Sequence, residues 1–367
     1  MKMKTLRYRV KFITPAFLGN AFQKGQWRVP PFKALLRQWW RVAYAHEVGY
    51  KWKELHNIEA RIFGAASDDG KGGTGKSRVR LRLEKWDSGN SKVITSTKNR
   101  FVCHPEVDLS HLRSEVKRNF YCSEHKKYHL VDSLLYLGYG PITTRGLANP
   151  PAVFGAINMA ISYGSPLNDE AKKLFSAFLR AIYLCNCFGT IGGRSRNGWG
   201  SFVLSPVDST EKISEFPSSK DEFEKEYGSI LRPLDKCLTL DWPHAIGMDK
   251  KGPLVWKTEP KNSWEEVMKD LAEIKIAFRT VLPFTGSNMA EDRHILAYPV
   301  TRHNVLGNND RLANQIRFKI MKTGNKYHGL IYHLPAKCPL KGVGHISEIG
   351  VWQKVHNQLD ARSGRFV

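Results

Sequence analysis

The sequence lacks any apolar run of the length that a membrane-spanning helix needs, about 18 to 20 residues. Its first residues form an alternating pattern rather than an apolar stretch, so we expect no signal peptide. Cysteine is scarce: the 367 residues include only six, and these are too few and too scattered for a disulfide scaffold. Several lie in apolar stretches, where reduced, buried thiols are usual. These features argue against a membrane-spanning or disulfide-stabilised secreted protein and predict a cytoplasmic one.

Acidic residues are few relative to basic ones. The chain has 57 Lys and Arg against 34 Asp and Glu, which gives a formal net charge of +23. Such an excess favours a polyanionic partner, such as RNA. A basic protein can also simply be soluble or come from a thermophile, but here the cations cluster in particular segments.

Hydrophobic periodicity predicts an α+β chain with two halves. Residues 5–14 and 78–86 alternate as strands, and Pro30 and Pro31 open a helix that ends near residue 46. The other expected strands are 134–139, 153–162, 199–204, 275–280, 315–322 and 327–334, and the other expected helices are 168–184, 264–274 and 351–359. The segment 205–225 is rich in Ser, Pro and charged residues and suits a linker. We therefore predict domains at 1–206, with an insertion around 87–130, and at 207–367.

The first predicted helix carries a basic stripe. Lys33, Arg37 and Arg41 recur every four residues and so line one side of the helix. Trp40 lies near the edge of the apolar face, where an exposed indole can stack on a base while the cations pair with phosphates. The alternative is a solvated basic face beside core tryptophans, and helix geometry leaves both readings open.

A glycine-rich segment spans residues 188–200. Five glycines in about a dozen residues do not suit a helix or a packed strand, but they let backbone N–H groups approach a phosphate. Gly192 and Gly193 precede Arg194 and Arg196, which add positive charge. We favour a phosphate-binding loop over a merely flexible one.

The strand expected at 78–86 places Arg78, Arg80 and Arg82 on one face. Like charges side by side repel one another, which favours an anion nearby, and RNA on an open sheet face is one such arrangement. A strand face open to solvent is the alternative. Lys76 precedes these arginines in the same basic segment and is a further RNA-binding candidate.

Residues 70–77 satisfy the phosphate-binding P-loop pattern. That motif requires a strand before it and a helix after it, whose N-terminus holds the phosphates. Here polar residues precede the match and the alternating strand follows it, so we expect no nucleotide site.

Four residues have the spacing of a tetrahedral zinc site, namely Cys103, Cys122, His125 and His129. His104 and His111 lie equally near in the sequence, so the ligand set is ambiguous. Solvated histidines in a basic insertion are the alternative, and no other cofactor is expected.

Several segments resemble the RAMP superfamily, and within it the first subunits of the Cmr complex, the type III-B CRISPR effector. They are residues 13–19 (ITPAFLG), 30–41 (PPFKALLRQWWR), 62–64 with 77–80, the loop 189–200, and 311–314 (RLAN). The resemblance covers both halves of the chain. It implies two ferredoxin-like (RRM-like) domains in tandem that contact guide RNA, neighbouring RAMP subunits and, as a further partner, target RNA in antiviral defence.

The resemblance also bears on catalysis. RAMP subunits that cleave target RNA carry an aspartate in the loop after the first strand, whereas residues 18–29 contain no Asp or Glu. We therefore expect a non-catalytic RNA-binding subunit. One alternative is a RAMP endoribonuclease that processes precursor guide RNA with His46 or His56 as the acid–base group. Another is a structural scaffold whose basic surfaces meet acidic partners.

Overall fold

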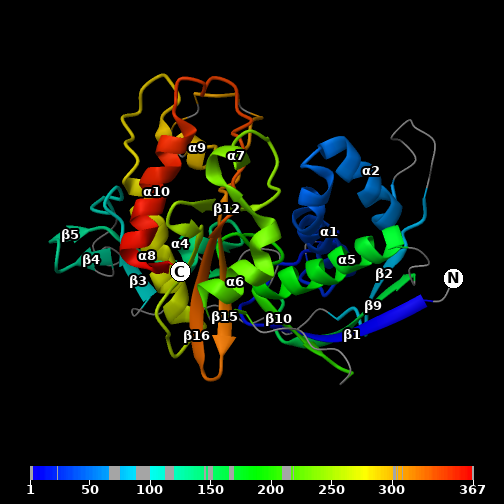
Figure 1. Cartoon of the computed structure of the whole chain (residues 1–367). Coiled ribbons are helices and arrows are strands. Elements are labelled where there is room, and N and C mark those ends of the chain that lie inside the picture. The colour runs from blue at the N-terminus through cyan, green and yellow to red at the C-terminus, as the bar shows by residue number, and fades with distance from the viewer. Residues whose placement is uncertain are drawn as a thin grey trace. The chain divides into compact units, whose positions relative to one another are not determined.

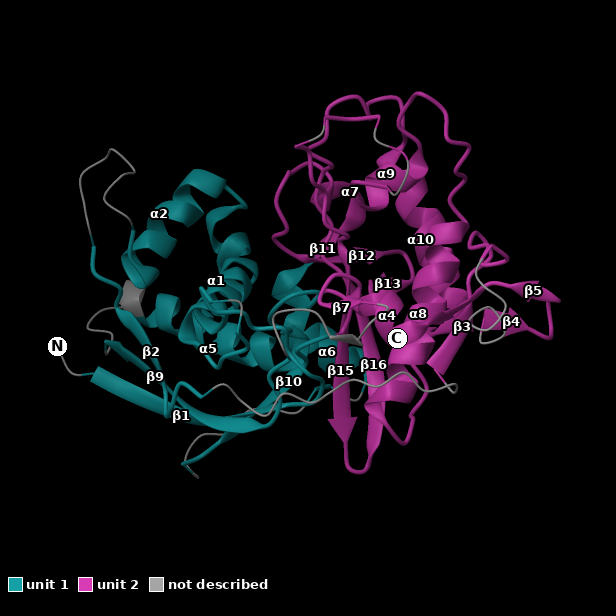
Figure 2. Cartoon of the chain, turned by 180° about the vertical axis from the view of Figure 1, so that it is seen from behind, with its two compact units in different colours: residues 1–92, 149–195, 199–231 teal, residues 93–148, 196–198, 232–367 magenta. Residues whose placement is uncertain are grey.

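The computed structural model (Figure 1) describes residues 3–22, 24–65, 75–87, 100–111, 120–143, 146–147, 152–164, 169–208, 216–217, 219–300, 303, 305–307 and 309–365. The chain divides into two compact units (Figure 2). Unit 1 comprises residues 1–92, 149–195 and 199–231, and unit 2 comprises residues 93–148, 196–198 and 232–367. Both contain helices and strands, so the predicted α+β class is confirmed.

The units differ from the predicted domains in two respects. Unit 1 extends to residue 231 rather than 206, because α6 (Lys220–Tyr227) belongs to it and buries Phe223 and Tyr227 completely. The segment expected to be a linker therefore includes a helix. The segment expected to be an insertion in the N-terminal domain falls largely in unit 2, where both β3 (Phe101–Cys103) and α4 (Ser133–Gly138) contact α8 (Trp264–Thr280).

Unit 1 is built on one four-stranded sheet. Its elements are β1 (Met3–Phe12), α1 (Val29–Tyr44), the 3-10 helix η1 (Ala45–Val48), α2 (Trp52–Phe63), β2 (Val79–Leu83), β9 (Ala156–Gly164), α5 (Asp169–Phe188), β10 (Phe202–Pro206), α6 and the 3-10 helix η4 (Gly228–Ile230). The sheet is antiparallel, with strand order β10-β1-β9-β2. The helices α1 and α5 pack together and lie along one face of it (Figure 1).

The strands of this sheet alternate between a buried and an exposed face. Along β1 the buried side chains, all at most 4% exposed, are Leu6, Tyr8, Val10 and Phe12. The side chains between them, Arg7, Arg9 and Lys11, are exposed. In β2, Val79 and Leu83 are buried while Arg80 and Arg82 are exposed. The predicted alternation of both strands is therefore confirmed.

Unit 2 has a second four-stranded sheet and several short hairpins. Its elements are β3, β4 (Tyr121–Cys122), β5 (Lys127–Tyr128), β6 (Leu130–Asp132), α4, β7 (Ile142–Thr143), β8 (Gly146–Leu147), β11 (Leu231–Pro233, which begins at the boundary), α7 (Leu234–Cys237), β12 (Ile246–Asp249), β13 (Gly252–Pro253), β14 (Val255–Lys257), α8, α9 (Asp292–Leu296), β15 (Ile316–Thr323), β16 (Lys326–His333), α10 (Glu348–Arg362) and β17 (Gly364–Arg365). Its main sheet has the order β15-β16-β14-β17, and α8 and α10 pack together.

The two main sheets share one topology. In unit 1 the chain runs β1-α1-β2-β9-α5-β10, apart from α2, and the sheet order is β10-β1-β9-β2. In unit 2 the chain runs β14-α8-β15-β16-α10-β17, apart from α9, and the sheet order read from its far edge is β17-β14-β16-β15. Each unit therefore has the succession strand, helix, two strands, helix and strand around its main sheet.

Two segments that we predicted to be strands are helical. Residues 134–139 lie mostly in α4, which begins because the Asp132 carboxylate accepts hydrogen bonds from the N–H groups of Leu134 and Leu135. Residues 275–280 complete α8, since Ile274 and Phe278, four residues apart and both buried, continue its apolar stripe. The strands predicted at 315–322 and 327–334 are confirmed as β15 and β16, which pair with each other as an antiparallel hairpin.

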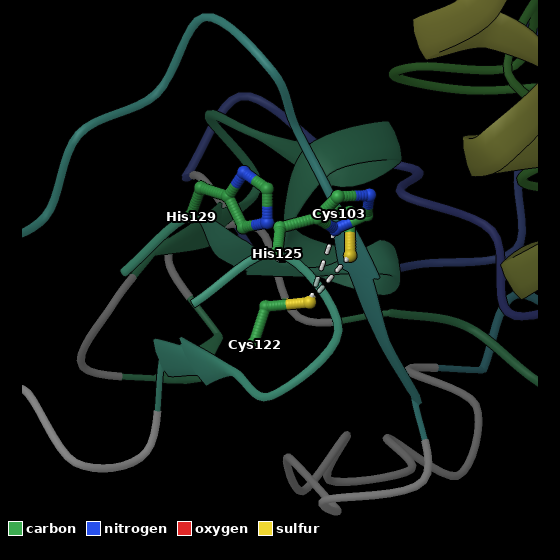
Figure 3. Close-up of side chains that lie close together, drawn as sticks. All are labelled: Cys103, Cys122, His125 and His129. Atoms are coloured by element: carbon green, nitrogen blue, oxygen red, sulfur yellow. Dashed lines mark hydrogen bonds between the residues drawn. The ribbon is translucent and has the colours of Figure 1, made fainter. Parts of the chain in front are cut away.

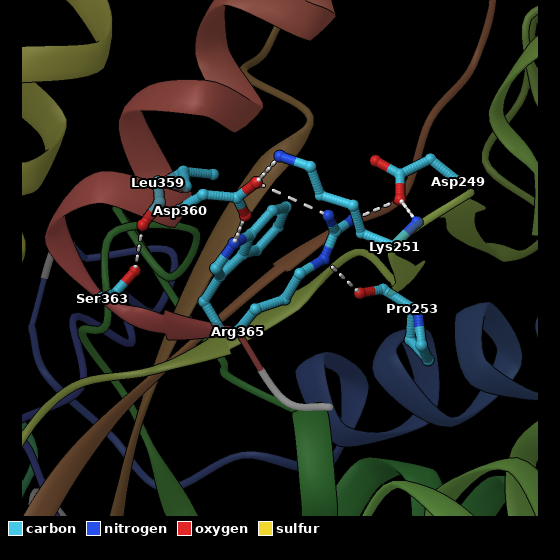
Figure 4. Close-up of polar contacts among 8 residues, drawn as sticks. Asp249, Lys251, Pro253, Leu359, Asp360, Ser363 and Arg365 are labelled. Carbon is cyan, nitrogen blue, oxygen red and sulfur yellow. Dashed lines mark hydrogen bonds and ion pairs between the residues drawn. The ribbon is translucent and has the colours of Figure 1, made fainter.

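A cluster of charges fastens the C-terminal strand of unit 2 (Figure 4). The guanidinium of Arg365 forms ion pairs with Asp249 at 2.8 Å and with Asp360 at 3.6 Å. Asp360 also accepts hydrogen bonds at 2.7 Å from Lys251 Nζ and at 2.7 Å from Trp256 Nε1. Burial alone would raise the pKa of a carboxyl group, but these contacts hold the pKa of Asp360 below its ordinary value.

Because folding favours the charged form of Asp360, its contribution to stability is present above the unfolded pKa of about 4 and is lost as the pH falls through the lower folded pKa. We expect Asp360→Asn to lower the melting temperature at neutral pH, and the difference from the parent to shrink between about pH 5 and pH 3. Thermal melts over this range check the prediction, with Asp241→Asn at an exposed position as the control. A difference that does not change with pH would contradict it.

Candidate nucleic-acid interface and metal cluster

The basic stripe on α1 exists, but two of its arginines already have an anionic partner. Arg37 Nε donates to Glu59 Oε1 at 2.6 Å. Arg41 donates from Nε to Glu59 Oε2 at 2.7 Å and from Nη2 to Oε1 at 2.9 Å. Glu59 is fully buried, whereas the arginine side chains remain 35% and 32% exposed. A buried carboxylate is costly unless it is paired, so both arginines serve the fold, with part of each surface still open to solvent.

Trp40 does not present a stacking surface, which corrects our prediction that it binds RNA. Its side chain is fully buried, as is that of Trp39. The ring stacks on Tyr44 with a centroid separation of 5.1 Å and meets the edge of Phe63 at 6.0 Å. The sequence pattern indicated one apolar face on this helix, but α2 packs against α1 and covers a second side.

Lys33 links the stripe on α1 to the segment before β2. Its Nζ donates to Ser77 Oγ at 3.1 Å, and Ser77 Oγ donates in turn to the carbonyl of Val79 at 2.7 Å. Burial, and then the charge of Arg37, lower the pKa of Lys33. The Lys33 ammonium is half-buried and hydrogen-bonded to Ser77, which lies between Lys76 and Arg78 of the predicted basic segment.

The cations around β2 are accessible. Lys76, Arg78, Arg80 and Arg82 are all exposed, and none has an ion pair with a residue in the part of the chain that the structure describes. Residues 70–74 of the P-loop match lie outside the described residues. The flanking elements are α2 before the match and β2 after it, which is not the strand–loop–helix order of a nucleotide site.

The glycine-rich segment 189–200 is a closely packed connection between α5 and β10. Gly192 has φ +95°, and a Cβ there would lie 2.7 Å from the carbonyl oxygen of Phe17. Gly193 N donates to that same carbonyl at 2.9 Å. Gly200 has φ +65°, and a Cβ there would overlap the carbonyl oxygen of Ile191. Packing against neighbouring backbone therefore explains these glycines without a phosphate.

The two arginines of this segment differ. Arg194 is exposed, with φ +56°, and remains available to a phosphate. Arg196 is counted with unit 2, where its Nη1 donates to the carbonyl of Asn314 at 2.9 Å. Burial, and then the charge of Arg317, lower the pKa of Arg196 to about 10. Its guanidinium is thus engaged with unit 2, and we withdraw the prediction that it contacts RNA.

The predicted metal ligands come together (Figure 3). The donor atoms of Cys103, Cys122, His125 and His129 all lie within 4.8 Å of one another. The two Sγ atoms are 3.2 Å apart, and Cys122 Sγ is 3.3 Å from His125 Nδ1. Cys103 ends β3, Cys122 ends β4, His125 lies in the β4–β5 turn, and His129 stands between β5 and β6. These four residues form a possible metal-binding group.

The two thiols differ in acidity. Burial and the hydrogen bond with Cys122 raise the pKa of Cys103 to about 12. Burial also opposes ionisation of Cys122, but hydrogen bonds involving His125 and His129 lower its pKa to about 6. One thiolate is therefore favoured near neutral pH, held by the neighbouring imidazoles.

His104, which the spacing left open as a ligand, is engaged elsewhere. Its ring packs against Tyr136 with centroids 5.5 Å apart, and its Nδ1 accepts a hydrogen bond from Glu106 N at 3.3 Å. The Glu106 carboxylate in turn binds the buried guanidinium of Arg293 at 2.6 and 2.8 Å. The cysteine–histidine cluster is thus carried by a segment that is anchored within unit 2.

The histidines of the nuclease alternative show no acid–base arrangement among the described residues. His46 Nε2 lies 3.3 Å from Glu47 Oε1, and burial lowers the pKa of the His46 imidazole. His56 packs against Trp52 with ring centroids 5.7 Å apart.

Sequence reasoning missed Glu59, although a signal was present. Glu59 lies four residues after Leu55 and three before Ile62, which are both buried, so it falls within the apolar stripe of α2. An acid in that position predicts a buried cationic partner.

Comparisons with known proteins identify the family of the chain and structures with a similar fold. The profile of the RAMP superfamily matches residues 9–203, more than half of the chain, so the chain belongs to the RAMP superfamily. No curated protein matches the sequence. Among solved structures, the apo form of Cmr1 from Pyrococcus furiosus is 16% identical, with a TM-score of 0.46 and 97% of each chain covered. A chain of the type III-B Cmr-beta complex bound to cognate target RNA is 13% identical, with a TM-score of 0.52, covering 98% of this chain and 100% of that one. At this identity the likeness concerns the fold.

The pairing of Glu59 with the α1 arginines can be tested by stability. We expect Arg41→Ala to destabilise the protein by about 2 to 3 kcal/mol, because it leaves a buried carboxylate with one partner. Adding Glu59→Gln to Arg41→Ala should restore part of that loss, since the uncompensated charge is removed. Denaturant melts of the single and double variants measure the coupling. Strictly additive effects would contradict the pairing.

The packing of the glycine-rich segment predicts a second effect on stability. Gly200→Ala should destabilise the protein by about 2 to 4 kcal/mol, because it adds a Cβ against backbone at a positive φ. The control is Gly228→Ala, where no heavy atom lies within 4 Å of the added Cβ and φ is −48°. Equal melting temperatures for the two variants would show that the segment adjusts freely.

Proposed function

We propose that this chain is a non-catalytic, RNA-binding subunit of a type III CRISPR effector complex, and that it contacts guide RNA and neighbouring RAMP subunits. Membership of the RAMP superfamily carries this proposal, together with exposed arginines on β2 that have no described anionic partner. A binding partner with a row of phosphates would neutralise that charge. Target RNA is proposed as a further ligand of the same subunit.

The fold supports the same assignment. The strand and helix order found in both units supports two ferredoxin-like domains in tandem. The Cmr-beta chain with the same overall fold was solved in a complex bound to cognate target RNA. We infer that the present chain occupies a comparable place among RAMP subunits. In the described residues no helix is long and apolar enough to cross a membrane, and a cytoplasmic location stays a prediction.

Three features favour binding over cleavage. The loop between β1 and α1 has no acidic residue in its sequence. His46 is paired with Glu47, and His56 packs on Trp52. General acid–base cleavage of RNA needs two groups aimed at one phosphodiester, and the described geometry gives no such pair.

We expect the full chain to bind labelled single-stranded RNA without cutting it. Salt should weaken binding, with a slope of about 0.7 per phosphate contact on logarithmic axes. Filter binding at several salt concentrations measures affinity, and denaturing gels of the same samples detect cleavage. Cleavage that His46→Ala or His56→Ala abolishes would favour the endoribonuclease alternative. No retention of RNA at low salt would favour the protein scaffold.

We further propose that the cysteine–histidine cluster holds one structural zinc ion. Tetrahedral zinc places sulfur and nitrogen ligands about 3.3 to 3.8 Å apart. The observed separations of 3.2 and 3.3 Å lie close to that range, and every donor pair is within 4.8 Å. The ion would tie β3 to the β4–β5 hairpin and to His129. Two-residue strands such as β4 and β5 bury little apolar surface, so a metal would stabilise them.

Elemental analysis of protein purified without chelators should find about one zinc per chain. His125→Ala should reduce this content, because it removes one ligand, whereas His111→Ala should not. Both histidines are exposed and lie in the segment 87–130 that was predicted as an insertion, so the two variants are a matched pair. Zinc content well below one in the parent, or an equal loss in both variants, would refute the site.

A further inference from the structure

Unit 1 presents one bare sheet face. The helices α1 and α5 cover the other face, and no described helix or strand of this unit lies over the side that carries the odd-numbered residues of β1 (Figure 2). Long cationic side chains project there from two strands, namely Arg7, Arg9 and Lys11 from β1 and Arg80 and Arg82 from β2. We call these five residues the sheet-face cations.

The pairing register separates these cations into two rows. β9 lies between β1 and β2, and Ala160 is paired with Arg7 on one side and with Arg82 on the other. Ser162 is likewise paired with Thr5 and with Arg80. A hydrogen bond of 2.8 Å between Thr5 Oγ1 and Ser162 Oγ confirms that these side chains share the exposed face.

The strand between the two rows carries short side chains. On this face β9 presents Ala156, Asn158, Ala160 and Ser162. Adjacent strands are about 4.8 Å apart, so the two cationic rows stand roughly 10 Å apart across this strip. Within β1, the cations recur at about 6.8 Å, which is similar to the separation of neighbouring phosphates in an extended nucleic-acid strand.

The charge on this face is only partly compensated. Arg7 lies 3.4 Å from Asp208, but both side chains are about half exposed, so the ion pair is weak. Glu84 follows Arg82 on the same face and is exposed. Arg9, Lys11, Arg80 and Arg82 have no ion pair within the described ranges. Positive charge therefore predominates along the whole strip.

We propose that a single strand of RNA lies along β9 on this face, with its phosphates held by the sheet-face cations. This inference rests on the proposed function and assigns it a surface. The strip has no aromatic side chain on which a base could stack, unlike the sheets of RNA-binding domains that read bases by stacking. Binding should accordingly depend on the RNA backbone and be nearly independent of RNA sequence.

The test uses the full chain and two pairs of charge removals. Arg9→Ala with Arg82→Ala should weaken binding of single-stranded RNA about tenfold or more, and lower the salt slope by about 1.4, or 0.7 for each lost phosphate contact. Lys53→Ala with Lys173→Ala removes the same charge from exposed helix positions of unit 1 and should change both quantities much less. Equal losses in the two double variants would mean that net charge alone matters, and would overturn the proposal.

A second pair of variants tests the strip itself. Ala160→Glu places a carboxylate between Arg7 and Arg82 and should reduce affinity, whereas Ala160→Gln has the same size without the charge and should bind nearly as the parent does. Melting temperatures close to the parent's establish that both variants fold. If the parent binds RNA and Ala160→Glu binds it equally well, the surface is wrong and the proposed function stands. If the parent retains only an acidic protein partner and no RNA, the proposed function fails first.

Discussion

The alternation of side chains along a strand is the constraint on which unit 1 depends. Once Leu6, Val10 and their neighbours are buried beneath α1 and α5, the residues between them must point to the opposite face. In β1 and β2 most of those residues are cationic. The same geometry that builds the core therefore gathers like charges on one surface, where mutual repulsion disfavours them unless an anion binds.

In unit 1, arginines that pair with a buried carboxylate are less available to bind a ligand than arginines on the sheet face. Glu59 is fully buried and takes both Arg37 and Arg41, so the most regular basic stripe in the sequence is largely committed to joining α1 and α2. The same contact between α1 and α2 also buries Trp40, since α2 covers that side of α1. The arginines of β2 have no such carboxylate among the described residues. Position in the fold, rather than density of charge along the chain, decides which cations are free.

Much of the fold and of the candidate site could be predicted from the sequence, and each feature that was missed has a physical reason. Period-two alternation predicted β1 and β2, and ligand spacing predicted the group around Cys103 and Cys122 because those contacts are local in the chain. The apolar stripe of α2 signals that Glu59 has a buried cationic partner, but it does not identify that partner as Arg37, which lies in another helix. The end of α8 was predicted as a strand because Ile276 and Phe278 are two residues apart, which is the strand period, although Ile274 and Phe278 continue the helical stripe. The hydrogen bond of Arg196 could not be predicted, because its acceptor, the carbonyl of Asn314, is 118 residues away in the sequence.

Photo-cross-linking tests the central claim most directly, namely that RNA lies on the exposed sheet face of unit 1. Single-stranded RNA containing 4-thiouridine would be irradiated on the full chain, and the cross-linked peptides identified by mass spectrometry. The account predicts cross-links within β1, β2 and β9, over residues 3–12, 79–83 and 156–164. Cross-links confined to unit 2 or to α2, with none in these three strands, would contradict it.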